Sequence, residues 1–312
     1  MDFSFFYRDE LELNNDINWD LFLSSFNNSD RVRDVFRDIT ATSKFWLIQP
    51  EYDFLTAEIP NSNVIVVKGK NELEQLQSLD SSLNLSQYID QRVCIDITGF
   101  MRPQLILLLR YLKNENFKSV DFIYSEPSIY KSKEKTEFSS GSVYETRQIT
   151  GFQGSNNAND KRDLIIILAG YDKNLIGRAV QYSENADVVM LFGFPSLQPD
   201  MYQENILCTV EAYDSMGEKP KDPLFAPAWD PFETASALIN YIDDNKCLRK
   251  YRHVYICPLS TKPQALGAGL AWMSRYENEA VSLIYPFTKN YQKETSTGVA
   301  KTWLYTVEFD NL

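Results

Sequence analysis

Short apolar runs of strand length alternate along the chain with segments whose apolar residues recur at helical spacing. In 30–39, for example, Val32, Val35, Phe36 and Ile39 fall on one helical face. Strands are also predicted at 21–26, 45–48, 64–67, 120–124, 164–168, 187–192, 280–285 and 302–309. The alternation of strands with helices predicts an α/β fold, in which mostly parallel sheets are covered by helices on both faces.

Two strand–turn–helix stretches, one beginning at Val93 and one at Val254, look like copies of each other. Each contains an apolar strand, a turn with hydroxyl and basic residues, a Pro-Gln pair and an apolar helix. The two valines are 161 residues apart, and Tyr124 and Tyr285 in the following strands keep the same offset. The pattern predicts an internal duplication, with two tandem Rossmann-like halves in a bilobal body that has a pseudo-twofold axis.

A change of composition predicts the boundary between these halves. Residues 131–163 are rich in Lys, Glu, Ser, Gly and Asn, and we interpret them as a polar linker or flap. The first half then covers 1–130. The second covers 164–312, with an insertion of about one helix around 199–250.

Composition excludes several classes of function. The formal net charge of −12 argues against an extended nucleic-acid surface, although a small anionic ligand in a local basic pocket stays possible. The single histidine, His253, argues against Ser–His, Cys–His and multi-histidine metal chemistry. Four scattered cysteines without a CxxC pair predict no metal site and a reducing, cytoplasmic location. No apolar run approaches the ~20 residues that span a bilayer, and nothing indicates a bound cofactor.

The two turns that follow the repeated strands are the best candidates for a ligand site. They contain Thr98, Gly99 and Arg102 in the first half, and Ser260, Thr261 and Lys262 in the second. Backbone NH groups and the helix dipole at such a turn attract anions, and a basic side chain adds charge. Ordinary helix capping with a solvated Lys or Arg explains the same residues.

Other polar and aromatic residues follow predicted strands. Gly170, Asp172 and Asn174 come after the strand at 164–168, and Arg178 follows on the next helix. Their counterparts in the first half are Ser24, Ser25, Asn27 and Arg31. Tyr130 and Tyr291 lie beyond the strands that end near Tyr124 and Tyr285, and they are candidates for stacking on a base or sugar. The dinucleotide fingerprint, the P-loop and the nucleophile elbow are all absent from the sequence.

Three carboxylates keep an enzyme possible. Asp96 lies within an otherwise apolar strand, so it needs hydrogen-bond partners or its pKa rises. Glu126 and Asp172 are further acid–base candidates, although no spacing pairs them.

The turn sequences Ile95-Asp-Ile-Thr-Gly99 and Leu259-Ser-Thr-Lys-Pro263 resemble those of Rossmann-type CARF domains, which sense cyclic oligonucleotides in prokaryotic defence. Two such folds in one chain are also similar to SAVED domains. The resemblance implies a nucleotide-like ligand in a cleft between the halves, and a bacterial antiviral role. The cleft would be lined by Thr98, Gly99, Arg102, Thr261 and Lys262. Because the chain has no nuclease, HEPN or protease signature, the resemblance also implies a partner protein that carries the effector activity.

The leading hypothesis from the sequence is therefore a sensor module for a small anionic, nucleotide-derived ligand that acts with a protein partner. An enzyme acting on a nucleotide or nucleoside is the first alternative. A structural subunit of a larger complex, in which the turns only cap helices, is the second.

Overall fold

The computed structural model describes residues 2–13, 17–130, 143–155, 160–199, 201–214, 221–293 and 296–312. The chain forms two compact units. The first unit contains residues 5–136 and 290–312, and the second unit contains residues 1–4 and 137–289. Each unit is an α/β structure built on one mostly parallel sheet, as the sequence predicts.

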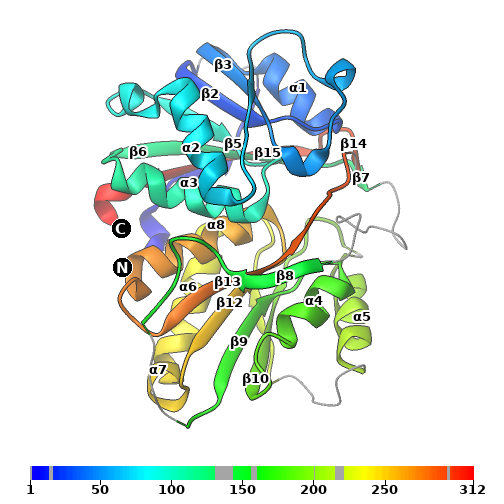
Figure 1. The fold of residues 1–312 in the computed structure, drawn as a ribbon, viewed down its shortest axis with the longest axis vertical. Coiled ribbons are helices and arrows are strands. Elements are labelled where there is room, and N and C mark those ends of the chain that lie inside the picture. Colours follow the sequence, from blue (N-terminus) through cyan, green and yellow to red (C-terminus); the bar gives the residue numbers. More distant parts are fainter. Residues whose placement is uncertain are drawn as a thin grey trace. The chain divides into compact units, whose positions relative to one another are not determined.

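Within its described residues, the first unit has a seven-stranded sheet (Figure 1). In sheet order the strands are β1 (Arg8–Glu10), β15 (Lys301–Glu308), β6 (Ser119–Glu126), β5 (Val93–Asp96), β2 (Trp19–Ser25), β3 (Ala41–Ile48) and β4 (Val64–Val66). The five strands from β6 to β4 are parallel to their neighbours. The other two, β15 and β1, add antiparallel at one edge. A two-stranded ribbon of β7 (Ile129–Tyr130) and β14 (Ser296–Thr297) belongs to the same unit.

Helices connect the parallel strands of the first unit. They are α1 (Asp30–Asp38), α2 (Glu72–Leu83) and α3 (Arg102–Asn114). Short 3-10 turns lie at Pro50–Tyr52, Thr56–Glu58, Leu85–Tyr88 and Phe309–Asn311. Because parallel crossovers are right-handed, α1 covers one face of the sheet, and α2 and α3 cover the other (Figure 1).

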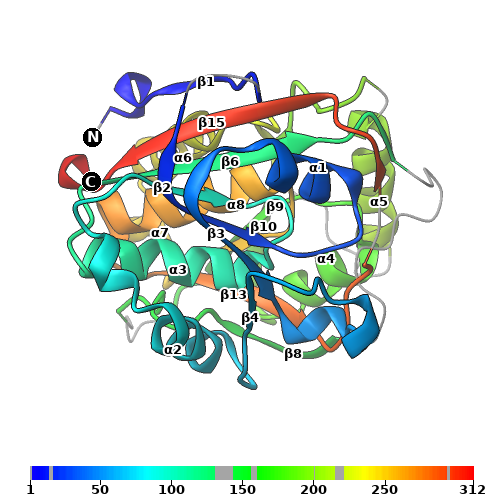
Figure 2. The same ribbon diagram turned by 90° about the horizontal axis from the view of Figure 1, so that it is seen from above.

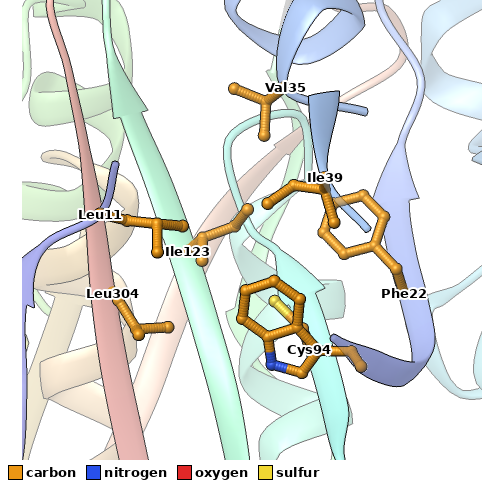
Figure 3. Packing of buried hydrophobic residues seen from close by; sticks show 8 residues of the cluster. Leu11, Phe22, Val35, Ile39, Cys94, Ile123 and Leu304 are labelled. Carbon is orange, nitrogen blue, oxygen red and sulfur yellow. The ribbon is translucent and has the colours of Figure 1, made fainter. Parts of the chain in front are cut away.

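The sheet face under α1 carries a packed core (Figure 3). Phe22, Cys94 and Ile123 from three neighbouring strands meet Val35 and Ile39 near the end of α1. Leu11, Trp19 and Leu304 complete the cluster. Cys94 is fully buried, so this thiol acts as a small apolar residue.

The second unit repeats the strand order of the first. Its described strands are β11 (Leu224–Ala226), β10 (Ala186–Gly193), β9 (Asp163–Leu168), β12 (Val254–Pro258), β13 (Val281–Thr288) and β8 (Val143–Gln148). All except β8 are parallel to their neighbours, and β8 pairs antiparallel with β13.

The helices of the second unit are α4 (Lys173–Val180), α5 (Met201–Asp214), α6 (Pro231–Asp244), α7 (Cys247–Lys250) and α8 (Lys262–Ala271), which continues as a π-helix at Trp272–Tyr276. Right-handed crossovers place α4 and α5 on one face of this sheet, and α6 and α8 on the other (Figure 2). In the described part of the chain, none of the helices is both long and apolar enough to traverse a bilayer.

The structure revises the predicted boundaries. Strand β15, placed in the second half by the sequence, pairs with β6 and β1 in the first unit. Strand β8, from the predicted polar linker, is an edge strand of the second sheet. The stretch 199–250 contains α5, which lies between β10 and β11 in the chain. At the equivalent place in the first unit, short 3-10 turns lie between β3 and β4. Common descent of the two halves stays a prediction, although their five parallel strands share one order.

Candidate functional site

The strand order of each sheet reverses beside its central strand, between β2 and β5 in the first unit and between β9 and β12 in the second. Ligands of open α/β sheets bind at the carboxyl ends of the strands at such a switch point. Thr98, Gly99 and Arg102 follow β5, while Ser260, Thr261 and Lys262 follow β12. The predicted turns therefore occupy equivalent positions in the two units.

Asp96, the last residue of β5, is held inside the sheet of the first unit. Its side chain is fully buried and accepts hydrogen bonds from Ser24 Oγ at 2.7 Å and from the Thr98 backbone NH at 2.9 Å. Burial raises the pKa of Asp96, and these hydrogen bonds oppose part of that rise. The hydrogen bond between Asp96 and Ser24 thus connects the end of β5 to the end of β2.

Thr98 continues the same network toward β6. Its hydroxyl oxygen accepts a hydrogen bond from the backbone NH of Ser125 at 3.0 Å. The carbonyl of Ser125 in turn accepts from Arg31 Nη1 at 3.0 Å. Thr98 and Arg31 are both buried, so these groups connect β5, β6 and α1.

Gly99 lies against β2 at the switch point. An added Cβ would fall 2.0 Å from the carbonyl oxygen of Ser25, so no larger residue fits without moving the backbone. The carbonyl of Gly99 accepts a hydrogen bond from the Tyr52 hydroxyl at 2.7 Å. Burial raises the pKa of Tyr52 to about 12, so the phenol stays protonated and donates.

Arg102 is the first residue of α3 and is mostly buried. The backbone NH just before it, on Met101, donates to Gln49 Oε1 at 3.0 Å. The same oxygen accepts from Ser25 Oγ at 2.8 Å. Gln49 therefore connects the backbone just before α3 to Ser25 at the end of β2.

The roles of Gln49 and Tyr52 were not predicted from the sequence. The available signal was the polar turn Gln49-Pro-Glu-Tyr-Asp53 directly after the strand at 45–48, because side chains after neighbouring parallel strands meet at one sheet edge.

In the second unit, the turn after β9 has the same close approach. A Cβ on Gly170 would lie 2.3 Å from the carbonyl oxygen of Leu259. Asp172 caps α4 by accepting from the backbone NH groups of Asn174 and Leu175 at 3.0 and 3.2 Å. Asn174 and Arg178 are exposed on α4.

The turn after β12 begins α8. Thr261 caps this helix by accepting from the Gln264 backbone NH at 3.3 Å, and its hydroxyl donates to the carbonyl of Ala228 at 2.5 Å. Ser260 is buried and Lys262 is half-buried. Gln264 is fully buried and donates to the carbonyl of Ala226 at 3.2 Å.

The two predicted stacking residues both belong to the first unit. Tyr291 follows the last strand of the second sheet in sequence, but its backbone NH donates to the carbonyl of Glu51 at 2.9 Å. The prediction that 164–312 forms the second half is therefore wrong for Tyr291, which lies in the same unit as Tyr130. Tyr130 ends β7 and pairs with Ser296 of β14, and its side chain lies outside the described residues.

Glu126, the last of the acid–base candidates, ends β6. Its carboxylate accepts from Trp303 Nε1 on β15 at 2.6 Å, and burial raises its pKa.

Among the residues that the structure describes, no group of three or more His, Cys, Asp and Glu side chains is placed to hold a metal ion. No protein-family model matches the chain, and no curated protein matches its sequence.

Proposed function

We propose that the protein is a binding module that recognises a small anionic, nucleotide-derived ligand and acts together with a partner protein. The observation that carries this proposal is the shared start of α3 and α8. Each helix begins with a basic residue, a proline and a glutamine, and each follows the strand beside the switch point of its sheet.

Charge and geometry support an anion at these two positions. A helix N-terminus carries partial positive charge from its backbone NH groups. Arg102 and Lys262 each add a formal positive charge at the first helical residue. The next residues, Pro103 and Pro263, have a φ angle that already suits a helix. The protein as a whole is acidic, so these basic positions stand out against a net charge of −12. The resemblance to CARF and SAVED proteins supports a nucleotide as the source of the anion.

The carboxylates favour binding over turnover. Asp96 holds Ser24 and Thr98, Asp172 caps α4, and Glu126 accepts from Trp303. A general acid or base must reach a proton of the substrate. Each of these groups is instead buried and engaged in a structural hydrogen bond.

Thermal unfolding of the full chain against mono-, di- and cyclic oligonucleotides tests the proposal. A ligand at about a hundred times its dissociation constant should add ~2.7 kcal/mol to the free energy of unfolding. We expect the double variant Arg102→Gln, Lys262→Gln to lose this stabilisation by the ligand. Lys118→Gln is the matched control, because Lys118 is exposed and forms a long ion pair with Asp90 at 3.5 Å.

The fate of the ligand separates the alternatives. A ligand that is recovered unchanged after incubation supports a sensor, whereas its conversion would establish an enzyme. Absence of any shift, together with no compound released on denaturation, would contradict the proposal and favour a structural subunit.

A further inference from the structure

An aromatic cluster lies at the carboxyl ends of β10 and β11 in the second unit. Phe192 and Phe225 belong to these two strands, Phe194 follows β10, and Tyr202 lies in the first turn of α5. The ring centroids of the contacting pairs are between 5.1 and 6.3 Å apart. The four side chains therefore pack against one another as aromatic pairs do.

Two of these rings are open to solvent. Phe194 and Phe225 are 52% and 46% exposed, whereas Phe192 is buried. The planes of the two exposed rings are inclined at 74°, with their centroids 6.3 Å apart. A flat ring that stacks on one of them is steeply inclined to the other, and aromatic pairs favour both arrangements. The exposed rings are therefore suited to bind a flat aromatic group.

Hydrogen bonds place this cluster next to the start of α8. The carbonyl of Ala226, the residue after Phe225, accepts from the Phe194 NH at 2.8 Å and from Gln264 Nε2 at 3.2 Å. Gln264 lies in the first turn of α8, which begins with Lys262. One carbonyl thus connects both exposed rings to this helix.

The loop after β11 makes a second connection. Thr261, the N-cap of α8, donates to the carbonyl of Ala228 at 2.5 Å, and the Ala228 NH donates to the carbonyl of Pro195 at 2.9 Å. Pro195 follows Phe194 directly. The rings and the NH groups at the start of α8 therefore lie at the same edge of the sheet.

A buried acceptor lies between the cluster and the helix. Gln264 is fully buried, and its Oε1 has no hydrogen-bond partner among the described residues. This oxygen is 3.5 Å from the position that a Cβ on Gly193 would take, and Gly193 precedes Phe194. An unpartnered buried acceptor is unfavourable, so it favours a bound molecule that has N–H groups.

We propose that Phe194, Tyr202 and Phe225, which we call the aromatic platform, bind a nucleobase of the ligand by stacking. A nucleobase is flat and carries N–H donors, and a nucleotide also carries an anionic phosphate. One nucleotide thus matches the rings, the Gln264 oxygen and the start of α8. The inference rests on the proposed function, and it assigns the base to the second unit.

Isothermal titration calorimetry of the full chain tests the stacking with two probes. The dinucleotide pApA and its abasic analogue carry the same phosphates and sugars, and only pApA has bases. We expect pApA to bind about 5- to 150-fold more tightly than the abasic analogue, which is the range that stacking of one base provides. Equal affinities of the two probes would overturn the inference.

Two double variants locate the stacked base. Phe194→Leu with Phe225→Leu keeps apolar side chains at half-exposed positions and removes the rings, so it should fold and lose the preference for pApA. Phe194→Tyr with Phe225→Tyr restores the rings and should keep the preference. Leu207→Ala is the matched control, because Leu207 is 62% exposed on α5 and has no ring. A preference that persists in the leucine variant would contradict the inference.

Lys262→Gln separates this inference from the function on which it rests. If Lys262→Gln weakens both probes and the leucine variant weakens neither, the anion site stands and the platform is wrong. If only the leucine variant weakens pApA, the platform stands and the basic turn is wrong. A wild type that binds neither probe contradicts both. Self-association of the wild type that the leucine variant loses would show that a second copy covers the rings, and would overturn the inference.

Discussion

The position of a Cβ on Gly99 lies 2.0 Å from the carbonyl oxygen of Ser25, closer than two non-bonded atoms approach. In the second unit, Gly170 has the same relationship with Leu259, at 2.3 Å. The glycine follows β5 in one unit and β9 in the other, so the two units achieve the same close approach from opposite sides of the switch point. Backbone packing therefore explains both glycines without a ligand.

Gly99→Ala should destabilise the first unit by ~3 kcal/mol or more, because the backbone of Ser25 must move to admit the new methyl group. The unfolding midpoint in urea measures this loss. Gly177→Ala is the matched control. It lies in α4 with no atom within 4 Å of its Cβ position, so alanine should stabilise the protein by ~1 kcal/mol. Equal effects of the two substitutions would contradict this interpretation.

Asp96→Ala should destabilise the protein by ~3 kcal/mol, because Ser24 Oγ and the Thr98 NH would lose a buried acceptor. Chemical denaturation measures the change. Asp90→Ala is the control, and we expect it to change the free energy of unfolding by less than ~0.5 kcal/mol, since that carboxylate is 81% exposed. If Asp96→Ala left the free energy of unfolding unchanged, the structural role of this residue would be contradicted. The enzyme alternative would then have to be tested with this variant.

The single histidine should make stability depend on pH. His253 is buried against Tyr255 and bonded to Ser282 Oγ at 2.8 Å, and burial lowers its pKa. The unfolded chain therefore binds a proton more readily than the folded chain. The contribution of the neutral His253 side chain to the free energy of unfolding is complete above the ordinary pKa of 6.5. It is lost as the pH falls through that value toward the lower pKa of the folded state.

Titration of the Tm of wild type and His253→Gln between pH 8 and 5 checks this sign. The wild type should lose more stability than the variant over the acidic part of the range. Parallel curves would show that the buried imidazole does not titrate differently in the folded state.

Trp303→Phe should destabilise the first unit by about 1–3 kcal/mol, since the buried carboxylate of Glu126 loses its indole donor. Burial raises the pKa of Glu126 above its unfolded value, so ionisation of this group opposes folding as the pH rises. The loss in Trp303→Phe should thus be larger at pH 7 than at pH 4. In a protein that also carries Glu126→Gln, the destabilisation by Trp303→Phe should be the same at pH 7 and pH 4. A difference that remained would show that another group titrates.

Local patterns in the sequence were sufficient to predict much of the fold. The helical spacing of Val32, Val35 and Ile39 predicted α1 and its buried face. The apolar strands that end at turns predicted the shared α/β class of both units. These features depend on residues that are close in sequence, which is why one chain is enough to predict them.

The candidate site was predicted only in part. The turns at Thr98 and Thr261 do occupy equivalent switch points. The residues that hydrogen-bond to the first of these turns, Gln49 and Tyr52, come from a loop about fifty residues earlier in the chain. Their contacts depend on which strand lies next to which, and the spacing of residues does not state that order.

The sequence by itself determined the order of strands and helices, the repeated strand–turn–helix pattern and the scarcity of histidine and clustered cysteine. Tertiary structure alone decided that β15 returns to the first sheet, that Tyr291 lies beside Glu51, and that Glu51, Gln75 and Gln104 share one hydrogen-bond network. The physical reason is that periodicity records which face of an element is buried, whereas pairing between distant segments is settled by the free energy of packing the whole unit.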